Sequence, residues 1–592
     1  ATLVVSNACR PNIDVTYPPR GATIKGAGAP LISITGNVHS DAGLITSFKV
    51  NGKSAAVQAN GNFSVPFSAQ VGGNTLILEA TDAKGTSRKR VQAFQWSTKY
   101  HKPNAAVPKS GMVDPGLGVW LGSEVLDDGD HSLPPDDLAT IFELVMASFD
   151  IGALLPSPAA DELSLAGATY DIFISNMNYA APTVALGSKT GALTFVAVIS
   201  GITADLYIDK TCTYSFPITC IGPSNMSGDV TMTSIVLSAD VQLSVNPDHS
   251  LNATPTNVDV ALNGLDINLD GFLGGLVEFF VGFFQDGFVS DLESSFNSEI
   301  SNQLAPILAS ALSSLAFDLE FEMPSLDPSG GTVPVNLKTD FSYTSVTASG
   351  AELGLRAGVY APKATPYDNL GALGRGGCGS GQQTMIVPGD GPIELVFPDD
   401  TLNELLYAAW NGGLLEFDVP PSLLGDVDLS TFGVSEIDIR VSGMLAPAIS
   451  DCNATNSLTV HIGDLRIDAD LTIFGTPLAV VMYAALEADV TLVAEDGQIG
   501  LQIGDIEEVY TEVTVDDDSL LSFEAVIDDL IQENLVPALL GSLGGDALGG
   551  FPLPEIDLST SLEGLPPGTG IAIAPQGVTR SGGNSIITGD LQ

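Results

Sequence analysis

Residues 523–558 read FEAVIDDLIQENLVPALLGSLGGDALGGFPLPEIDL, a segment that combines a helix with a strand. Its first part repeats apolar side chains at intervals of three and four residues, the spacing of one buried helix face. These side chains are Val526, Ile527, Leu530, Ile531, Leu535, Leu539 and Leu543. Pro537 lies within this helix, where a proline bends the backbone, and GFPLP at residues 550–554 predicts a proline-bearing strand.

An earlier part of the chain has the same elements in the same order. Residues 275–315 carry a longer apolar stripe with Pro306 near its end. Short motifs agree in pairs: LAPIL at 304–308 with LVPAL at 535–539, EMPSL at 322–326 with PLPEI at 552–556, and ADVQL at 239–243 with ADVTL at 488–492. Three matches in one order indicate an internal duplication, whose unit is longer than 200 residues and therefore a domain and not a solenoid repeat.

Each copy opens on a shorter amphipathic helix. The periodicity predicts these helices at residues 135–149 and 400–412. Two adjacent aspartates begin each helix, where carboxylates favour the positive end of the helix dipole: Asp136 and Asp137, and Asp399 and Asp400. Long alternating strands follow in both copies, as in VTMTSIVLSADVQLSV at residues 230–245.

Apolar helices beside long alternating strands predict the fold class. A helix with a wide apolar stripe needs an apolar cover, and a strongly curved antiparallel sheet wrapped round it provides one. We expect an α+β protein with two such tubular domains. In each domain, we expect the gap beside the helix to form an elongated apolar pocket. The pocket candidates on the helices are Ile141, Phe142, Val145, Phe149, Leu276, Phe279, Phe280, Phe283, Phe284, Phe288, Leu405, Leu406, Trp410, Ile527, Leu530, Ile531 and Leu535. The alternative for each is a side chain that only fills the core.

The segment 523–558 resembles the C-terminal signature of the family that includes bactericidal/permeability-increasing protein, lipopolysaccharide-binding protein and cholesteryl ester transfer protein. The match rests on Val536-Pro537 and on Gly550–Pro554, and residues 402–415, LNELLYAAWNGGLL, are similar to the helix that opens the family's second domain. The resemblance covers about residues 115–592 in the order of their elements. It implies two tubular lipid-binding (TULIP) domains with acyl chains in apolar pockets near their junction.

Residues 11–96 follow another pattern. Short alternating segments are separated by Asn51-Gly52 and Asn60-Gly61, dipeptides that favour hairpin turns. The spacing suits a β-sandwich, and the motifs VNG, GNF and GGN resemble bacterial immunoglobulin-like modules. We therefore expect an immunoglobulin-like β-sandwich at residues 1–97, a linker at 98–115, and TULIP-like domains at 116–330 and 331–592.

The chain is strongly acidic. It carries 71 Asp and Glu against 21 Lys and Arg, a net charge of −50. This excess repels nucleic acid and anionic membranes, and it argues against the anionic lipid A that the antibacterial members of the resembled family bind. Hydrophobic residues make up 44% and the mean hydropathy is +0.27, but no apolar run reaches about 18 residues, so we expect no transmembrane helix.

Five cysteines form no CxxC motif, so structural zinc and thioredoxin-type redox chemistry gain no support. Cys212 and Cys220 are candidates for a short disulfide loop, Cys378 and Cys452 are candidates for a longer bridge, and Cys9 is left over. Disulfides imply an oxidising compartment, and a start at ATLVV without Met agrees with a removed signal peptide. We expect a secreted, periplasmic or cell-surface protein.

Residues 266–271, DINLDG, copy the opening of an EF-hand loop through Asp266, Asn268 and Asp270. Position 277 holds Val where the loop requires a Glu. The alternative, a strand with outward aspartates that ends in a turn, is therefore favoured over calcium binding. We expect no other cofactor.

The sequence lacks the common catalytic motifs. None of its five histidines lies in HExxH, and it has no G-x-S-x-G elbow and no P-loop. We expect a bacterial protein that binds or transfers a lipid or another long apolar ligand without catalysis. Two alternatives stay open: a structural subunit of the cell surface or of a filament with the same folds, and a lipid hydrolase. Association with the outer membrane or cell surface, and assembly into homo-oligomers, are compatible with the lipid-binding protein and with the structural subunit.

Overall fold

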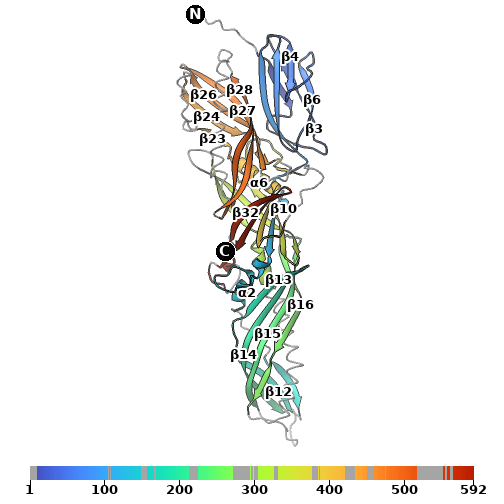
Figure 1. Cartoon of the computed structure of the whole chain (residues 1–592), viewed down its shortest axis with the longest axis vertical. Helices are drawn as coiled ribbons and strands as arrows, with labels where there is room; N and C mark the ends of the chain where they lie inside the picture. Colours follow the sequence, from blue (N-terminus) through green and yellow to red (C-terminus); the bar gives the residue numbers. More distant parts are fainter. Residues whose placement is uncertain are drawn as a thin grey trace.

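The structure is a computed structural model of the chain. It describes residues 10–104, 106, 109–147, 152, 157–165, 168–212, 225–270, 294, 298, 305–325, 331–375, 385, 387–419, 434–449, 458–473, 475–495, 497–515, 551–553, 556–560, 565–567 and 569–591. The molecule is elongated, with an N-terminal β-sandwich at one end and a long curled sheet at the other (Figure 1). A second curled sheet lies beside the sandwich, and a central sheet connects the two curled sheets.

The sandwich consists of two sheets with the strand orders β1-β3-β6 and β2-β8-β7-β4-β5. Its strands are β1 (Asn12–Tyr17), β2 (Ala22–Lys25), β3 (Leu31–His39), β4 (Ile45–Val50), β5 (Lys53–Ser54), β6 (Asn62–Ser68), β7 (Gly72–Asp82) and β8 (Ser87–Ser97). Alternate residues of β7 are buried, as a sheet with one core face requires. Phe48 and Phe63, one from each sheet, meet in this core with ring centroids 4.7 Å apart.

The two predicted hairpin turns differ in outcome. Asn51 and Gly52 both have positive φ, 46° and 72°, and connect the antiparallel pair β4–β5 as expected. Asn60-Gly61 also forms a turn, in which the Gly61 N–H donates to the Gln58 carbonyl at 2.9 Å. However, β6 pairs with β3 in the other sheet, which places Phe63 in the core, so the prediction of a hairpin at this turn was wrong.

The central sheet has the order β18-β19-β20-β10-β22-β33-β32. Its strands are β10 (Val113–Gly122), β18 (Asp318–Pro324), β19 (Thr332–Val346), β20 (Gly350–Tyr360), β22 (Ile393–Pro398), β32 (Ile573–Ser581) and β33 (Asn584–Leu591). Residues 118–121 of β10 pair with β20 on one side and with β22 on the other. The sheet thus combines strands from both sides of the expected boundary at residue 330. In the expected linker, β9 (Lys99–His101) pairs with β21 (Ala372–Gly374).

The first curled sheet has the order β11-β12-β14-β15-β16, with β13 paired to β14 and β17 paired to β15. Its strands are β11 (Ala160–Leu165), β12 (Ala168–Asn178), β13 (Thr183–Lys189), β14 (Ala192–Cys212), β15 (Met226–Val245), β16 (Leu251–Asn263) and β17 (Asp266–Leu269). Buried and exposed residues alternate along β14 and β15, so one face of these 21- and 20-residue strands covers the core.

The second curled sheet repeats this plan with the order β23-β24-β26-β27-β28-β29 and with β25 paired to β26. Its strands are β23 (Glu416–Val419), β24 (Val434–Gly443), β25 (Ala448–Ile449), β26 (Leu458–Ile473), β27 (Thr476–Glu495), β28 (Gln498–Val515) and β29 (Phe551–Pro552). A short pair, β30 (Ile556–Asp557) with β31 (Gly570–Ile571), and the 3-10 helix η9 (Leu558–Thr560) follow.

The register of the two sheets supports the internal duplication. Asp240 of β15 lies opposite Thr194 of β14, and Asp489 of β27 lies opposite Thr459 of β26. The next pairs along the strands are Val241 with Leu193 and Val490 with Leu458. The ADV motifs found in the sequence therefore occupy equivalent strands and face equivalent partners.

Four helices are described: α1 (Ser123–Leu126), α2 (Leu138–Ala147), α5 (Ala305–Ser313) and α6 (Asp399–Gly412). Helix α2 lies within the helix predicted at residues 135–149. Helix α6 begins one residue before the helix predicted at 400–412 and ends at the same residue. Asp137 accepts the Thr140 N–H at 2.7 Å and caps α2, as its position in the sequence suggested. The predicted helix at 275–315 is seen in α5, and most of its remainder lies outside the described residues. The one at 523–543 lies wholly outside them.

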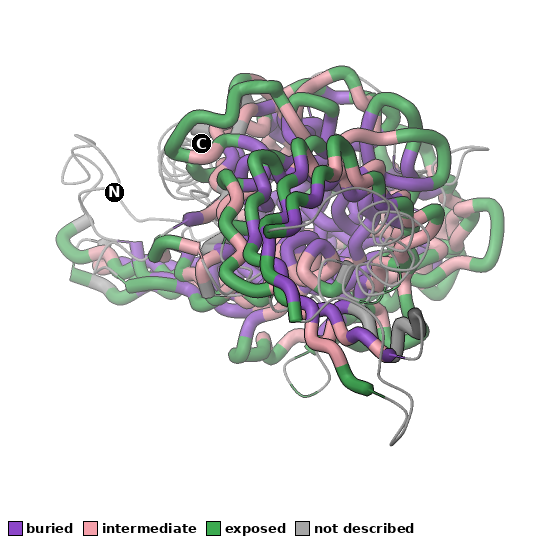
Figure 2. The backbone as a smooth tube through the Cα atoms, turned by 90° about the horizontal axis from the view of Figure 1, so that it is seen from below, coloured by how far each residue is buried: buried purple, intermediate pink, exposed green. Residues whose placement is uncertain are grey.

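The buried residues that the structure describes form two large cores and a small third cluster of Met385, Val396 and Ile586. One core runs through both curled sheets and the central sheet, and the sandwich has a separate core. In a view along the molecule, buried backbone lies inside and exposed segments surround it (Figure 2). The long core places α6 against the central sheet, where the candidate site lies.

Candidate apolar ligand site

A pocket lies between α6, the central sheet and the second curled sheet. Its enclosed part is small, about 30 Å³, and about 510 Å³ of space lies between its walls when the part open to solvent is counted. Every wall is mainly apolar, and the lining consists of Leu117, Leu337, Thr339, Ala357, Val359, Phe397, Thr401, Leu402, Leu405, Leu492, Ile499 and Leu501. The pocket therefore lies where the second curled sheet meets the sheet that connects it to the first.

The two polar residues in the lining are already hydrogen bonded. The Thr401 hydroxyl donates to the Gly116 carbonyl at 2.5 Å. The Thr339 hydroxyl accepts the Phe317 N–H at 2.8 Å and donates to the Phe317 carbonyl at 3.2 Å. Neither hydroxyl has to find a partner in a ligand, so the interior suits a hydrocarbon chain.

Helix α6 supplies one wall through Leu402 and Leu405, which lie one turn apart on the same face. Its C-terminus is closed by Gly413, whose φ of 104° lies in the left-handed region and whose N–H donates to the carbonyls of Ala409 and Trp410. The Trp410 indole N–H donates to the Gly443 carbonyl at 2.8 Å. These contacts fix the end of α6 against the second curled sheet.

Buried charges fix the other end of α6. Arg580 of β32 binds Asp399 in a bidentate pair with distances of 2.6 and 2.7 Å, and Arg375 also contacts this carboxylate. Asp400 accepts the Arg375 N–H at 2.9 Å and lies 3.3 Å from His101. Burial raises the pKa of Asp400, but the His101 and Arg375 contacts outweigh it and lower that pKa below its usual value. The helix N-terminus is thus tied to β9, β21 and β32.

Glu404 is a buried acid beside these charges. Its Oε2 accepts the Val359 N–H at 2.9 Å, while its Oε1 has no partner among the described residues. Burial raises the pKa of Glu404 well above its usual value, and the Val359 N–H offsets this only in part. Burial therefore favours the protonated form of this carboxyl, which lies against β20 next to one wall of the pocket.

The candidates on the first opening helix pack into the core. Ile141, Phe142 and Val145 of α2 are buried, and Phe142 meets Phe195 of β14 edge to face with centroids 6.4 Å apart. None of these three lines the pocket described above. Phe149 lies outside the described residues.

The candidates on α6 divide into two groups. Leu405 lines the pocket, whereas Leu406 and Trp410 are buried elsewhere and do not line it. The remaining candidates lie outside the described residues, and their role stays a prediction: Leu276, Phe279, Phe280, Phe283, Phe284, Phe288, Ile527, Leu530, Ile531 and Leu535.

Sequence reasoning missed the strand residues that make up most of the lining. Leu337, Thr339, Ala357 and Val359 alternate along β19 and β20, so strand alternation identified an inward face but not this pocket. Their meeting with Leu492 and Leu501 depends on long-range packing that no local pattern reveals.

The other predicted sites have these outcomes. Cys212 is disulfide-bonded, and Cys220, Cys378 and Cys452 lie outside the described residues, so the pairings stay predictions. Asp266 and Asn268 point outward from β17 between buried Ile267 and Leu269, which agrees with the favoured strand interpretation. Asp270 accepts a hydrogen bond from Ser227 at 3.2 Å. Within the described part of the chain, no three His, Cys, Asp or Glu side chains form a metal-binding group, and calcium binding stays untested.

No family model and no curated protein sequence matches the chain. Among solved structures, lipopolysaccharide binding protein matches with 13% identity and a TM-score of 0.37, over 81% of this chain and 99% of that one. P47 of Clostridium botulinum E1 matches with 8% identity and a TM-score of 0.25, over 81% and 100%. Latherin matches with 13% identity and a TM-score of 0.16, over 31% and 84%.

Lipopolysaccharide binding protein is one member of the family that residues 523–558 resemble. The function is taken from the pocket and not from these matches. No helix in the described part of the chain is long and apolar enough to span a membrane.

Proposed function

We propose that this chain binds a lipid, or another molecule with a long hydrocarbon chain, in the α6 pocket and performs no catalysis. The observation that carries the proposal is the composition of the pocket wall. Ten of its twelve lining residues are apolar, and both threonines satisfy their hydroxyls within the protein. Each ligand methylene that leaves water for this pocket contributes about 0.8 kcal/mol to binding.

The same wall limits the ligand's chemistry. A polar headgroup inside the pocket would lose its water without gaining a hydrogen bond, which costs about 1–3 kcal/mol for each group. The headgroup therefore stays at the pocket mouth or in solvent. The net charge of −50 disfavours a negatively charged headgroup there, so a neutral or zwitterionic lipid fits best.

Four finer assignments accompany this proposal. The sandwich, with sheets β1-β3-β6 and β2-β8-β7-β4-β5, is an immunoglobulin-like module, and residues 116–330 and 331–592 are the two TULIP-like domains. The protein works outside the cytoplasm, which the disulfide at Cys212 supports. There it carries or transfers its ligand.

A direct test begins with the protein purified from its host and extracted with organic solvent under denaturing conditions. Mass spectrometry should find one or two acyl-chain species at near-stoichiometric amounts. A clean extract, repeated after incubation with host lipids, would contradict the proposal and favour the structural subunit.

A variant locates the ligand in this pocket. Leu405→Trp fills the space beside α6 and should weaken binding of the neutral apolar dye N-phenyl-1-naphthylamine by at least about tenfold, a loss of about 1.4 kcal/mol. Leu44→Trp is the matched control because Leu44 is 81% exposed in the sandwich. Equal dye affinity in the two variants would place the ligand elsewhere.

A further inference from the structure

The pocket beside α6 is narrow in the form described above. Its enclosed part measures about 30 Å³, whereas an apolar cavity of about 150 Å³ takes up a molecule as small as benzene. A hydrocarbon chain becomes enclosed only when the walls of the pocket move apart. One wall is α6, and another is the second curled sheet with Leu492, Ile499 and Leu501.

Segment 369–375 connects the sandwich to the α6 wall. Its backbone donates one N–H to the Thr23 hydroxyl of β2 at 2.9 Å and accepts the Ser97 hydroxyl of β8. The N–H of its last residue donates to Asp400 of α6 at 2.9 Å, and the side chain of its first residue accepts the Tyr407 hydroxyl at 2.8 Å. The sandwich and α6 are therefore held by one hydrogen-bonded segment.

The sandwich is connected to the second curled sheet as well. The Val91 and Ala93 N–H groups of β8 donate to the carboxylates of Glu512 at 3.0 Å and Asp464 at 2.9 Å. Both N–H groups lie on the edge of β8 that β2 leaves free, because β2 pairs only with residues 94–97. The sandwich thus bridges the α6 wall and the sheet that forms the other wall.

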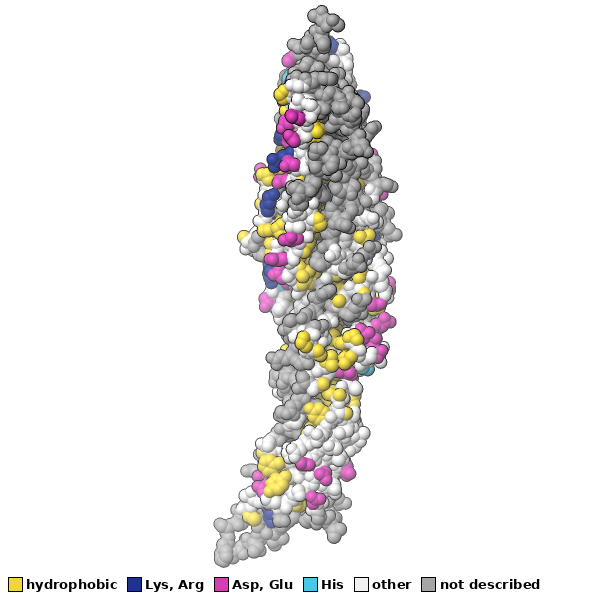
Figure 3. Space-filling model, turned by 90° about the vertical axis from the view of Figure 1, so that its left-hand side faces the viewer, with side chains coloured by type: hydrophobic (Ala, Val, Ile, Leu, Met, Phe, Trp, Pro, Cys, Tyr) yellow, Lys and Arg dark blue, Asp and Glu magenta, His cyan; other side chains and the backbone are white. Residues whose placement is uncertain are grey.

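The contact between sandwich and sheet joins opposite charges. Residues 1–115 hold twelve Lys and Arg against five Asp and Glu, whereas residues 116–592 hold nine against sixty-six. In Figure 3, most of the Lys and Arg side chains lie in the upper half of the molecule, which contains the sandwich. Arg20 binds both Asp464 and Glu512 at 2.7 Å. An interface of ion pairs and hydrogen bonds can exchange its partners for water, so its docking is more readily reversed than that of an apolar interface.

The second curled sheet changes its register at the level where the sandwich docks. The β26–β27 pairing shifts within residues 462–465, and the β27–β28 pairing shifts twice within residues 487–490. These shifts are neighbours, since Ile462 lies opposite Leu486. Each shift places one extra residue on one strand, and such bulges bend a sheet. They form a bend line across the three strands, and Asp464 lies on it.

The bend line separates the pocket wall from part of the docking site. Leu492, Ile499 and Leu501 lie beyond it toward the β27–β28 turn, and Glu512 lies on its other side. A change in the bend therefore moves this wall relative to the sandwich. In the first curled sheet, at the other end of the molecule, the equivalent pair β14–β15 keeps one register along residues 193–208, and the shifts of that sheet lie in its other strand pairs.

We propose that the sandwich is a clamp on the pocket: while docked, it holds α6 and the second curled sheet in the narrow form, and it must loosen before a hydrocarbon chain can be enclosed. This inference rests on the function proposed above. Ligand binding and sandwich docking then oppose each other, and by linkage each weakens the other by the same factor. The sandwich regulates the pocket from outside, because none of the lining residues described above comes from it.

Weakening the clamp should strengthen ligand binding. Asp464→Asn removes the charge that holds Arg20 and should bind N-phenyl-1-naphthylamine at least about fivefold more tightly than the parent chain, the lower end of usual coupling factors. Asp468→Asn is the matched control, because Asp468 lies on the same strand and pairs with Arg466 instead of with the sandwich. It should bind the dye like the parent chain. Equal or weaker binding by an Asp464→Asn variant that keeps the parent's circular dichroism overturns the proposal.

The parent chain allows a second test without any substitution. The Val91 and Ala93 N–H groups are hydrogen bonded across the interface, so their hydrogen exchange reports whether the sandwich is docked. Saturating dye should speed this exchange at least about fivefold, while the amides of the β4–β7 pair inside the sandwich keep their rates. Unchanged or slower exchange at Val91 and Ala93 overturns the proposal.

The Leu405→Trp variant separates the clamp from the proposed function. If the dye binds equally to the parent chain and to Leu405→Trp, the ligand lies outside the pocket, and the proposed function fails together with the clamp. If Leu405→Trp weakens dye binding but Asp464→Asn leaves it unchanged, the clamp alone is overturned.

Discussion

Arg20 of the sandwich donates through Nη1 to Oδ1 of Asp464 on the second curled sheet, at a distance of 2.7 Å. Its Nη2 donates to Glu512 at the same distance, and its guanidinium lies 3.5 Å above the ring of Tyr483. The other oxygen of Asp464 accepts the backbone N–H groups of Gly21 and Ala93. The sandwich is therefore held on the sheet by a buried, fully hydrogen-bonded carboxylate.

Asp464→Asn should lower the free energy of unfolding by about 3–5 kcal/mol, because Arg20 loses a buried partner. Asp464 has a φ of 46°, a conformation that Asn also adopts, so the backbone is kept while one acceptor oxygen becomes an NH2 donor that faces another donor. Calorimetry should show a separate, earlier unfolding of the sandwich. Asp468→Asn is the control, because its pair with Arg466 is 38–42% exposed and should contribute less than about 1 kcal/mol.

Gly73→Ala should disturb the same interface by steric overlap. A methyl group on Gly73 would lie 2.1 Å from Cγ of His461, too close for either side chain to remain in place. We expect a loss of about 1–3 kcal/mol in thermal unfolding. Gly28→Ala, which meets no atom within 4 Å, should leave the melting temperature unchanged. Similar melting temperatures for the two variants would show that the interface is looser than described.

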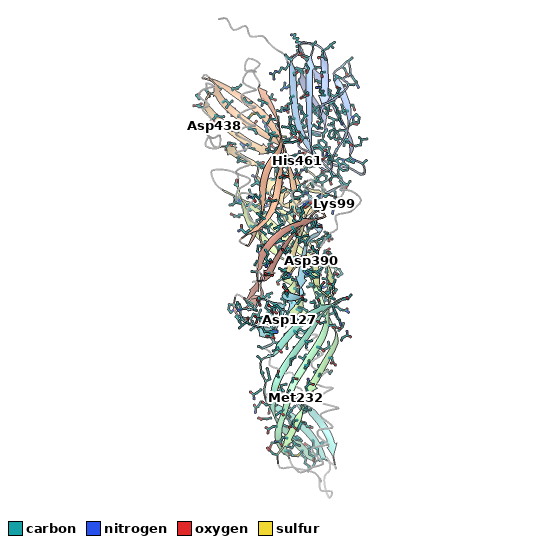
Figure 4. The ribbon with its side chains drawn as sticks, in the orientation of Figure 1. Lys99, Asp127, Met232, Asp390, Asp438 and His461 are labelled. Atoms are coloured by element: carbon teal, nitrogen blue, oxygen red, sulfur yellow. The ribbon has the colours of Figure 1, made fainter. Side chains whose placement is uncertain are left out.

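His461 makes the docked sandwich sensitive to acid. It lies between the second curled sheet and the sandwich, where it contacts the Thr75 hydroxyl at 3.0 Å (Figure 4). Burial lowers its pKa from 6.5 to about 4. The folded state thus binds this proton less readily than the unfolded chain. Its contribution of about 3 kcal/mol is complete above pH 6.5 and is lost as the pH falls toward 4.

The His461→Gln variant removes this titration. Unfolding measured by denaturant between pH 7 and pH 4 should decline less steeply in the variant than in the parent chain. Carboxylates that titrate in the same range affect both proteins equally, so the difference reports His461. If the free energy of unfolding declines equally with pH in the variant and in the parent chain, water reaches the imidazole and the expected titration is contradicted.

Glu404 has the opposite pH dependence. Its raised pKa means that the folded state retains a proton that the unfolded chain releases near pH 4.5. The stability that this group contributes is complete below that pH and declines as the pH rises. Glu404→Gln copies the protonated form and keeps an acceptor for the Val359 N–H. The variant should therefore melt higher than the parent chain at pH 8 and equally at pH 4.

Local patterns predicted the parts of the fold that depend on local interactions. Adjacent aspartates mark the beginning of α6, and the ADV motifs of β15 and β27 identify equivalent strands. Leu405 was found because helical periodicity reports which face of α6 is buried.

Long-range pairings account for what the sequence did not reveal. Asp399 meets Arg580 across 181 residues, and Arg20 meets Asp464 across 444, so neither pair has a local signal. The total charge of −50 likewise concealed a basic sandwich, because a sum contains no information about position. The pocket was missed because the strands that line it come from distant parts of the chain and meet only through long-range packing.

The position of β33 in the central sheet has a consequence for synthesis in the cell. This strand, Asn584–Leu591, pairs with β22, Ile393–Pro398, about 190 residues earlier, and lies between β22 and β32. A nascent chain on the ribosome can form the sandwich early, but β22 stays without this neighbour until Leu591 has been translated. The edge of β22, the strand that carries Phe397, thus stays unpaired on this side until about 190 further residues have been translated, and unpaired strand edges favour aggregation.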